Sequence, residues 1–278
     1  MFQINLSKCV ITTTALVLMF LTIPVQAQLS TAKMDVLRLQ FNNATFKKTA
    51  ITKLDIKASN VNFASGSIKN ISVLCTGIKQ KDIFIDKMNF TFNNAQFSSE
   101  KLLTNQELML KNPVTASGSI TITENNINTM LNNTKTQKKL ANLAKIKIKQ
   151  LGLKINGGLV SFIKPKAHIL PNNTLRIEMT AALAGMIGFP VILQSQITLQ
   201  NNKIVLTNPK IITSGMDLPD EISGLLNQKL NEIIDVNEKF KEDADIRFTS
   251  VNVIPNSSIN ITANALIKKL NFKKKNVK

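Results

Sequence analysis

The sequence predicts an α+β protein in which a curved antiparallel β-sheet presents one apolar face and a long amphipathic helix packs against that face. Three observations indicate this class. Apolar and polar residues alternate along most of the chain beyond residue 50, which is the period of a β-strand. Short segments rich in Asn and Pro separate successive strand candidates, and such connections favour antiparallel pairing. One strong helical stripe lies between residues 217 and 235.

Strands account for most of the expected secondary structure. The clearest early candidate spans residues 82–92 and places Phe84, Met88, Phe90 and Phe92 on one face. Three later pairs are expected to be hairpins, because turn residues separate their two strands. These turns are 171–173, 201–202 and 255–258. The strand candidates are 53–63, 82–92, 114–122, 159–170, 174–184, 191–200, 203–208, 246–254 and 259–267.

Two regions predict helices. Thr123 and Glu124 suit an N-cap and a first turn, and apolar residues at helical spacing follow them. A second short helix is expected over residues 140–146. The longer helix begins near Asp217 and Pro219, and its apolar stripe packs on the sheet. That stripe consists of Ile222, Leu225, Leu226, Leu230, Ile233 and Ile234.

Residues 28–267 are expected to form one domain. No Gly/Ser linker divides them, and no internal repeat of fixed period is visible. The remaining segment, 268–278, contains six Lys and no acidic residue. Such a run predicts a solvated, disordered basic tail.

The first 27 residues have the three parts of a secretory signal peptide. Lys8 supplies the positive charge, an apolar stretch follows, and the small residues Val25 and Ala27 predict cleavage after Ala27. The alternative is a retained membrane anchor, but the stretch is shorter than the roughly 20 apolar residues that a spanning helix needs. The protein is therefore expected outside the cytoplasm, and tethered to the membrane if the segment is not cut.

The chain is strongly basic, with a net charge of +18 that becomes +17 when cleavage removes Lys8. Such a charge suits an anionic partner. Export argues against nucleic acid, so anionic lipid headgroups or a negatively charged membrane surface are the expected partner. The alternative is that the charge only reflects a composition rich in Lys, Asn and Ile.

The residue types that catalysis and metal binding require are scarce. His168 is the single histidine, and no Gly-x-Ser-x-Gly motif accompanies it. One histidine and the one cysteine left after cleavage, Cys75, do not make a common zinc site. Cys75 alternates with Ile71 and Val73 and is expected to be buried. The sequence therefore predicts no enzyme, no cofactor and no metal site.

Apolar surface is what the sequence does offer. The connection from Leu183 to Val191 is apolar, whereas loops are normally polar, so it lies either against the core or against a lipid. A curved sheet with an apolar inner face and a helix in its mouth suits lipid binding. The residues expected to line this groove are Phe84, Met88, Phe90, Met130, Met179, Met186, Phe189, Ile222, Leu225, Leu226 and Ile233.

Four segments, in their order along the chain, resemble the LmeA-like phospholipid-binding family of actinobacterial and cyanobacterial envelope proteins. They are 68–78, 120–128 with Thr-Glu at a helix start, the hairpin 170–177, and 218–230 in the late helix. The chain departs from the pattern at Asn173, where a Gly is common. The resemblance implies a strongly curved, folded-over antiparallel sheet that holds the long helix. It also implies the periplasm or the thylakoid lumen, and phospholipid binding without established catalysis.

These expectations converge on a non-catalytic phospholipid-binding protein of the cell envelope, which holds lipid in an apolar groove. Two alternatives remain open. One is an envelope structural or assembly module that binds other proteins through its sheet edges. The other is a hydrolase that uses His168 or carboxylates without a recognisable motif.

Overall fold

The computed structural model describes residues 33–46, 49–80, 83–101, 107–134, 137–138, 160–183, 188–201, 203–213, 244–268 and 271–273. Two antiparallel sheets dominate this part of the chain. None of the helices in it combines the length and the apolar character that crossing a membrane requires. The expected helices over 140–146 and 217–235 lie outside the described residues.

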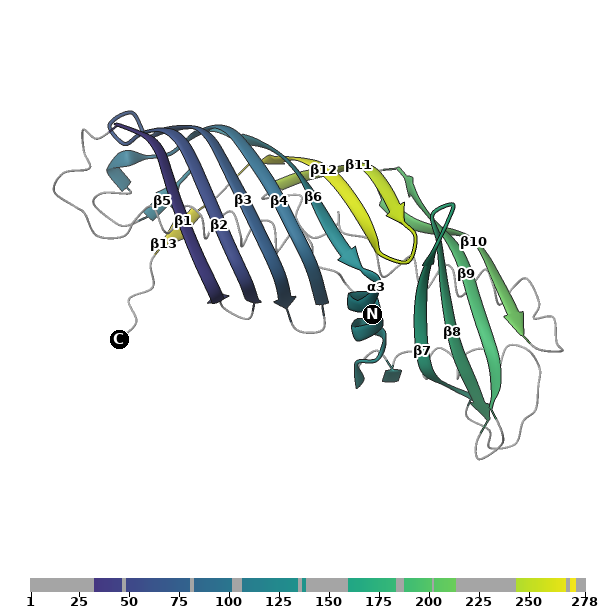
Figure 1. Ribbon diagram of the computed structural model, residues 1–278. Coiled ribbons are helices and arrows are strands. Elements are labelled where there is room, and N and C mark those ends of the chain that lie inside the picture. Colours follow the sequence, from purple (N-terminus) through teal and green to yellow (C-terminus); the bar gives the residue numbers. More distant parts are fainter. Residues whose placement is uncertain are drawn as a thin grey trace.

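The larger sheet has seven strands in the order β1-β2-β3-β4-β6-β12-β11 (Figure 1). Its first four strands form a meander in chain order, and a hairpin from near the end of the chain pairs with β6. The antiparallel pairing expected from the sequence is thereby confirmed. The strands are β1 (Lys33–Phe46), β2 (Thr49–Asn62), β3 (Ser67–Gln80), β4 (Ile83–Gln96), β6 (Val114–Thr123), β12 (Ser258–Ile267) and β11 (Ala244–Ile254).

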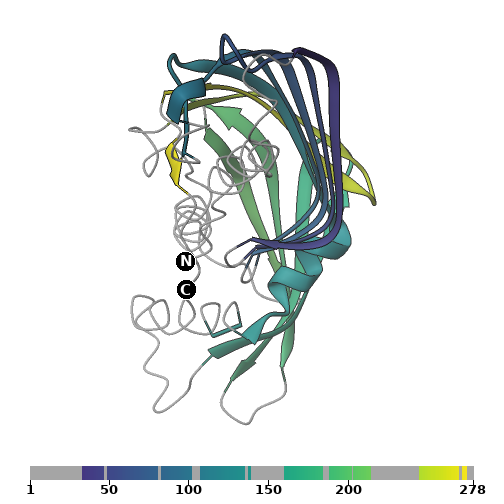
Figure 2. The ribbon, with the colours of Figure 1, turned by 90° about the vertical axis from the view of Figure 1, so that its left-hand side faces the viewer.

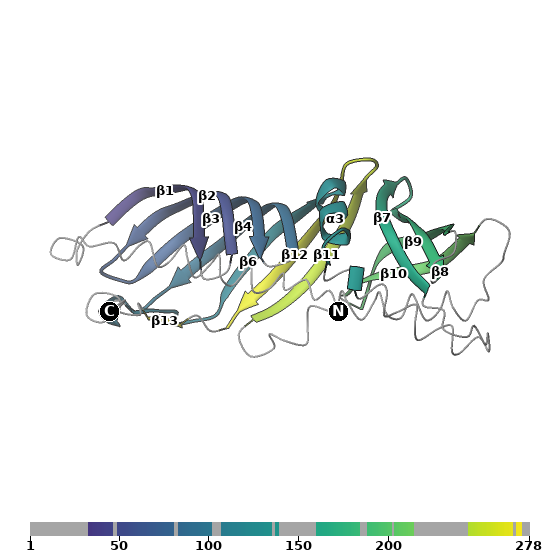
Figure 3. The same ribbon diagram turned by 90° about the horizontal axis from the view of Figure 1, so that it is seen from below.

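The smaller sheet has four strands in the order β10-β9-β8-β7. The three expected hairpins are confirmed: two build this sheet, and the third is β11–β12 in the larger one. The strands are β7 (Val160–Leu170), β8 (Thr174–Leu183), β9 (Phe189–Gln200) and β10 (Lys203–Thr213). Helix α3 (Glu124–Leu131) lies between the two sheets, as the view from below shows (Figure 3).

Two short strands form a separate pair. β5 (Glu107–Met109) and β13 (Asn271–Lys273) align antiparallel. The segment 268–278, expected to be a disordered tail, therefore contains a strand. The reason is backbone pairing with a distant segment, which local charge does not reveal.

The first four strands carry a 17-residue repeat that the sequence analysis did not recognise. Their left-handed residues, which have positive φ, are Asn43, Asn60, Gly77 and Asn94, each 17 positions after the one before. The buried residues repeat with them: positions 51, 54, 56, 58 and 61 of β2 recur at 68, 71, 73, 75 and 78 of β3 and at 85, 88, 90, 92 and 95 of β4. The intervals of three residues within this pattern obscure a simple alternation and hide the repeat.

The left-handed residues interrupt the strand ladder along two lines that cross β1 to β4. Bend row 1 contains Asp35, Asn60, Lys69 and Asn94, and bend row 2 contains Asn43, Thr52, Gly77 and Asp86; none of these residues is a paired position in the register. Each strand thus has one left-handed residue, and the alternation of faces shifts by one position at both rows. Gly and Asn adopt this conformation most readily. The strands turn at two places along their length when the sheet is viewed from its end (Figure 2).

Candidate functional site

The inner face of the larger sheet, defined as the face that carries Leu54, Cys75 and Met88, is apolar from edge to edge. Between the two bend rows, three successive rows of paired residues cross the sheet. The first is Phe41, Leu54, Cys75, Met88, Ile120, Ile261 and Val251; the second is Leu39, Ile56, Val73, Phe90, Gly118, Ala263 and Phe248; the third is Leu37, Ala58, Ile71, Phe92, Ala116 and Ala265. A row over seven strands spans roughly 29 Å, because neighbouring strands lie about 4.8 Å apart.

The opposite, outer face of this sheet is polar in the corresponding rows. One row reads Arg38, Lys57, Ser72, Thr91, Ser117, Asn264 and Arg247. Arg38 forms a bidentate ion pair with Asp55, with Nε–Oδ1 at 3.0 Å and Nη2–Oδ2 at 2.5 Å. This hydrogen-bonded pairing lowers the pKa of Asp55 from 3.8 to about 2. The strands therefore separate one apolar face from one charged, hydrated face.

The inner faces of both sheets contribute to one apolar core. Leu54, Cys75 and Met88 are fully buried, and residues of the smaller sheet such as Ile169 and Ile197 join the same cluster. The expected burial of Cys75 is confirmed. The apolar surface thus extends from the larger sheet to the smaller one.

Ser195 is the polar exception on the inner side of the smaller sheet. It lies on β9 between the buried residues Leu193 and Ile197, and only 3% of its surface is exposed. Its hydroxyl Oγ has no hydrogen-bond partner among the residues that the structure describes. A buried hydroxyl without a partner costs free energy.

Side chains of α3 attach the smaller sheet to the larger one. Thr123 caps the helix and accepts a hydrogen bond from the Asn126 N–H, as the sequence predicts. Asn128 then pairs with the edge of β7 as a strand would: it accepts from the Ala167 N–H at 2.7 Å and donates to the Ala167 carbonyl at 3.0 Å. Glu124 Oε2 accepts from the Ile169 N–H at 2.8 Å.

His168 lies beside this junction. Its Nδ1 is 3.5 Å from Glu124 Oε1, and about a quarter of its side chain is exposed. Glu124 already accepts the Ile169 N–H, so the carboxylate holds the edge of β7 in place. No group of three or more His, Cys, Asp or Glu residues suited to a metal ion occurs in the described part of the chain. The surroundings of His168 thus support a structural role.

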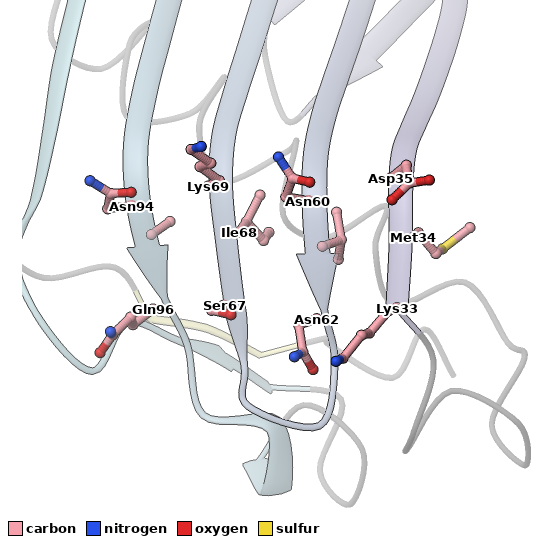
Figure 4. Close-up of a pocket in the computed structure, with 12 residues that line it drawn as sticks. Lys33, Met34, Asp35, Asn60, Asn62, Ser67, Ile68, Lys69, Asn94 and Gln96 are labelled. Carbon is pink, nitrogen blue, oxygen red and sulfur yellow. The ribbon is translucent and has the colours of Figure 1, made fainter.

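A polar groove of about 430 Å³ lies on the larger sheet along bend row 1 (Figure 4). Asp35, Asn60, Lys69 and Asn94 form one side of it; Lys33, Asn62, Ser67 and Gln96 form the other. Met34, Val61, Ile68 and Ala95 also line the groove, and they belong to or pack against the apolar core. The groove therefore combines charged and amide side chains with apolar ones, unlike the uniformly apolar rows of the inner face.

Comparison with known families bears directly on the apolar face. The sequence model of LmeA-like phospholipid-binding proteins matches residues 52–263, more than half of the 278-residue chain. The chain belongs to the LmeA-like phospholipid-binding family. The resemblance noted from the sequence is confirmed. No curated protein and no solved structure matches this LmeA-like chain.

Two of the segments that carry the family resemblance have clear structural roles in this LmeA-like protein. Thr123 and Glu124 begin α3 and attach it to β7. In the β7–β8 hairpin, Asn172 and Asn173 both have positive φ, and the Asn173 carbonyl accepts the Ile197 N–H at 2.7 Å. Asn at position 173 replaces the more common Gly because both residues tolerate this backbone conformation. The late-helix segment 218–230 lies outside the described residues.

The structure places some of the expected groove residues together and separates others. Met88 and Phe90 lie in adjacent rows of the inner face, and Met130 of α3 packs against the same core. Met179 lies with Ile177 and Leu193 in a smaller cluster between α3 and the four-stranded sheet. Met186, the side chain of Phe189, and the helix residues Ile222, Leu225, Leu226 and Ile233 lie outside the described residues.

Phe84 departs from the expected row with Met88 and Phe90: it packs against the same core but is only partly buried. It pairs with Lys79, whose ammonium group lies 5.3 Å from the ring centre, while the neighbouring Ile85 takes the buried position. Bend row 2 crosses β4 at Asp86 and shifts the alternation there. On β3, alternation correctly placed Ile71, Val73 and Cys75 on one face, whereas β1 was not predicted as a strand.

Proposed function

We propose that this protein is a non-catalytic phospholipid-binding protein of the cell envelope, and that the inner face holds the acyl chains. The observation that carries the proposal is the run of three uninterrupted apolar rows across the larger sheet. Membership of a phospholipid-binding family supports lipid as the ligand. An elongated apolar face of this kind suits acyl chains.

The dimensions of the inner face suit acyl chains. A row of roughly 29 Å is comparable with the roughly 30 Å hydrocarbon thickness of a bilayer, which contains two layers of chains. Each buried methylene contributes about 0.8 kcal/mol to binding. The two bend rows turn the strands around this face.

The proposed ligand is an anionic phospholipid. The net charge of +18 supports this choice, and so do exposed lysines of the outer face such as Lys53, Lys57 and Lys87. The proposed location is the periplasm or the thylakoid lumen, reached through cleavage after Ala27. Mass measurement of the exported protein tests cleavage directly, because an uncut chain keeps residues 1–27 and remains tethered.

Lipid extraction from the purified, exported protein followed by mass spectrometry tests the function. We expect phospholipid at a fixed ratio to protein, and flotation with vesicles that contain anionic lipid but not with vesicles of zwitterionic lipid alone. Recovery of no lipid, together with no vesicle binding, would contradict the proposal. A protein partner in fixed ratio without lipid would instead support the assembly-module alternative.

A pair of variants locates the site on the inner face. Val73→Asn puts an amide among the apolar rows, whereas Ser72→Asn puts the same group on the outer face one residue away. We expect several-fold less bound lipid for Val73→Asn and an unchanged amount for Ser72→Asn. Circular dichroism shows whether both variants are folded, and the milder Val73→Thr replaces Val73→Asn if it is not. Equal loss in both variants would place the lipid elsewhere.

A further inference from the structure

Strand β1 forms one edge of the larger sheet. Within the described part of the chain it pairs only with β2, through 12 paired positions along its 14 residues. Val36 on this strand is 53% exposed. An edge strand of this length presents a row of backbone N–H and C=O groups that another strand can pair with. A strand that pairs with this edge must match the two bends of β1, at Asp35 and Asn43.

The repeat sets strict requirements for that strand. Leu39, Ile56, Val73 and Phe90 mark the centres of β1 to β4 and face one another in one row. Each strand has its left-handed residue four positions after the centre. That residue always lies opposite the position four before the centre of its neighbour, as Asn60 lies opposite Lys69. Left-handed and extended residues therefore alternate along both bend rows.

We propose that β1 pairs antiparallel with β1 of a second copy of this chain, with Leu39 on the two-fold axis. In this register, Asn43 of one copy lies opposite Asp35 of the other, and the reverse pair forms as well. Both bend rows then continue across the interface with their alternation intact. A shift by two residues brings bend positions opposite regular ones, and a shift by one brings apolar side chains opposite polar ones.

The side chains agree with this register. Leu39 of one copy faces Leu39 of the other, and Met34 of one copy faces Ala44 of the other. Apolar residues therefore meet on the inner side. On the outer side Arg38 faces Gln40, and Val36 faces Asn42, so no like charges are directly opposed. A two-fold axis perpendicular to the sheet places both inner faces on the same side. The apolar rows of one copy therefore continue into those of the other.

Cysteine crosslinking combined with mass measurement in solution tests the interface. The wild-type protein is expected at twice the monomer mass by light scattering. Under mild oxidation, Leu39→Cys is expected to form a covalent dimer, because the two side chains face each other across the axis. Leu37→Cys is the matched control. Leu37 lies on the same face of the same strand, but in the proposed register it faces Phe41 of the other copy, four positions away from the second Leu37. The wild-type protein, in which Cys75 is buried, sets the background.

The outcomes separate cleanly. A dimer that crosslinks through Leu39→Cys well above the wild-type and Leu37→Cys levels supports the register. A monomeric protein at high concentration overturns the proposal, and so does a dimer in which Leu37→Cys crosslinks as well as Leu39→Cys. If Leu39→Cys does not fold, Val36→Cys and Asn42→Cys combined in one chain replace it, because these positions face each other across the axis. Lipid binding is measured separately, so failure of this interface leaves the proposed function standing.

Discussion

At the scale of single residues, Gly118 shows how closely the inner face is packed. A methyl group added at Gly118 would lie 2.3 Å from the Phe90 ring and 2.4 Å from the Asn89 carbonyl oxygen. Phe90 is the direct neighbour of Gly118 on the adjoining strand. The ring thus occupies the space that a side chain on β6 would need.

Gly118→Ala is therefore expected to destabilise the protein by about 1–3 kcal/mol, the usual cost of overpacking. Urea unfolding measures the change. Ser117→Ala, on the outer face of the same strand, is the control and is expected to alter stability by less than about 0.5 kcal/mol. Equal effects of the two substitutions would show that the Phe90 contact does not limit this position.

The Arg38–Asp55 pair predicts a specific response to pH. Asp55 has a folded-state pKa of about 2, below its usual 3.8. Its contribution to stability is therefore complete above pH 3.8 and is lost as the pH falls through 2. Arg38→Met is expected to return the Asp55 pKa toward 3.8, measured by NMR titration of the carboxyl carbon. Lys57→Met, which removes a nearby charge without removing the hydrogen bonds, should leave this pKa low.

At the scale of elements, α3 acts as an adaptor between two sheets that do not pair with each other. Its side chains supply the hydrogen bonds that a neighbouring strand would give to the edge of β7. The Asn128 side chain hydrogen-bonds to both the N–H and the C=O of Ala167, and Asn132 donates to the Pro165 carbonyl at 3.1 Å. The β11–β12 turn completes the set, since the Asn256 N–H donates to the Ile169 carbonyl at 2.8 Å.

Asn128→Ala is expected to destabilise the junction by about 2–4 kcal/mol, because the N–H and C=O of Ala167 both lose their partner. Hydrogen exchange checks the location of the effect: the Ala167 amide should exchange faster in the variant. Asn125→Ala, at an exposed position of the same helix, makes the same change of residue type without the contact. Unchanged protection of Ala167 in Asn128→Ala would contradict the adaptor role.

At the scale of the whole molecule, the two bend rows shape the larger sheet. Asn60 has a φ of 52° within a strand that is otherwise extended. A β-branched residue is strained there by about 1–2 kcal/mol. Asn60→Val is expected to lose that stability in thermal or urea unfolding, and Asn60→Gly to lose little. Ser59→Val, one residue away with a regular backbone, is the control; destabilisation of the same size there would refute the bend assignment.

The bends also explain which parts of the fold were predictable. Strands without a bend row, such as β6 and β12, alternate regularly, and both were predicted as strands. On β4 the prediction was right for Met88, Phe90 and Phe92 but wrong for Phe84, because the alternation shifts at Asp86. The same three-residue intervals concealed the 17-residue repeat, and β1 was not predicted as a strand at all.

The sequence by itself determined the antiparallel pairing, the hairpins, the start of α3, the burial of Cys75 and the family. The structural features follow from local periodicity and turn residues, which act over a few neighbouring residues, and the family follows from the order of short motifs along the chain. Only the tertiary structure decided that the apolar rows align across seven strands, that Asn128 joins the sheets, and that β13 pairs with β5. Each of these depends on contacts between residues far apart in the chain, which set the register and identify the partner.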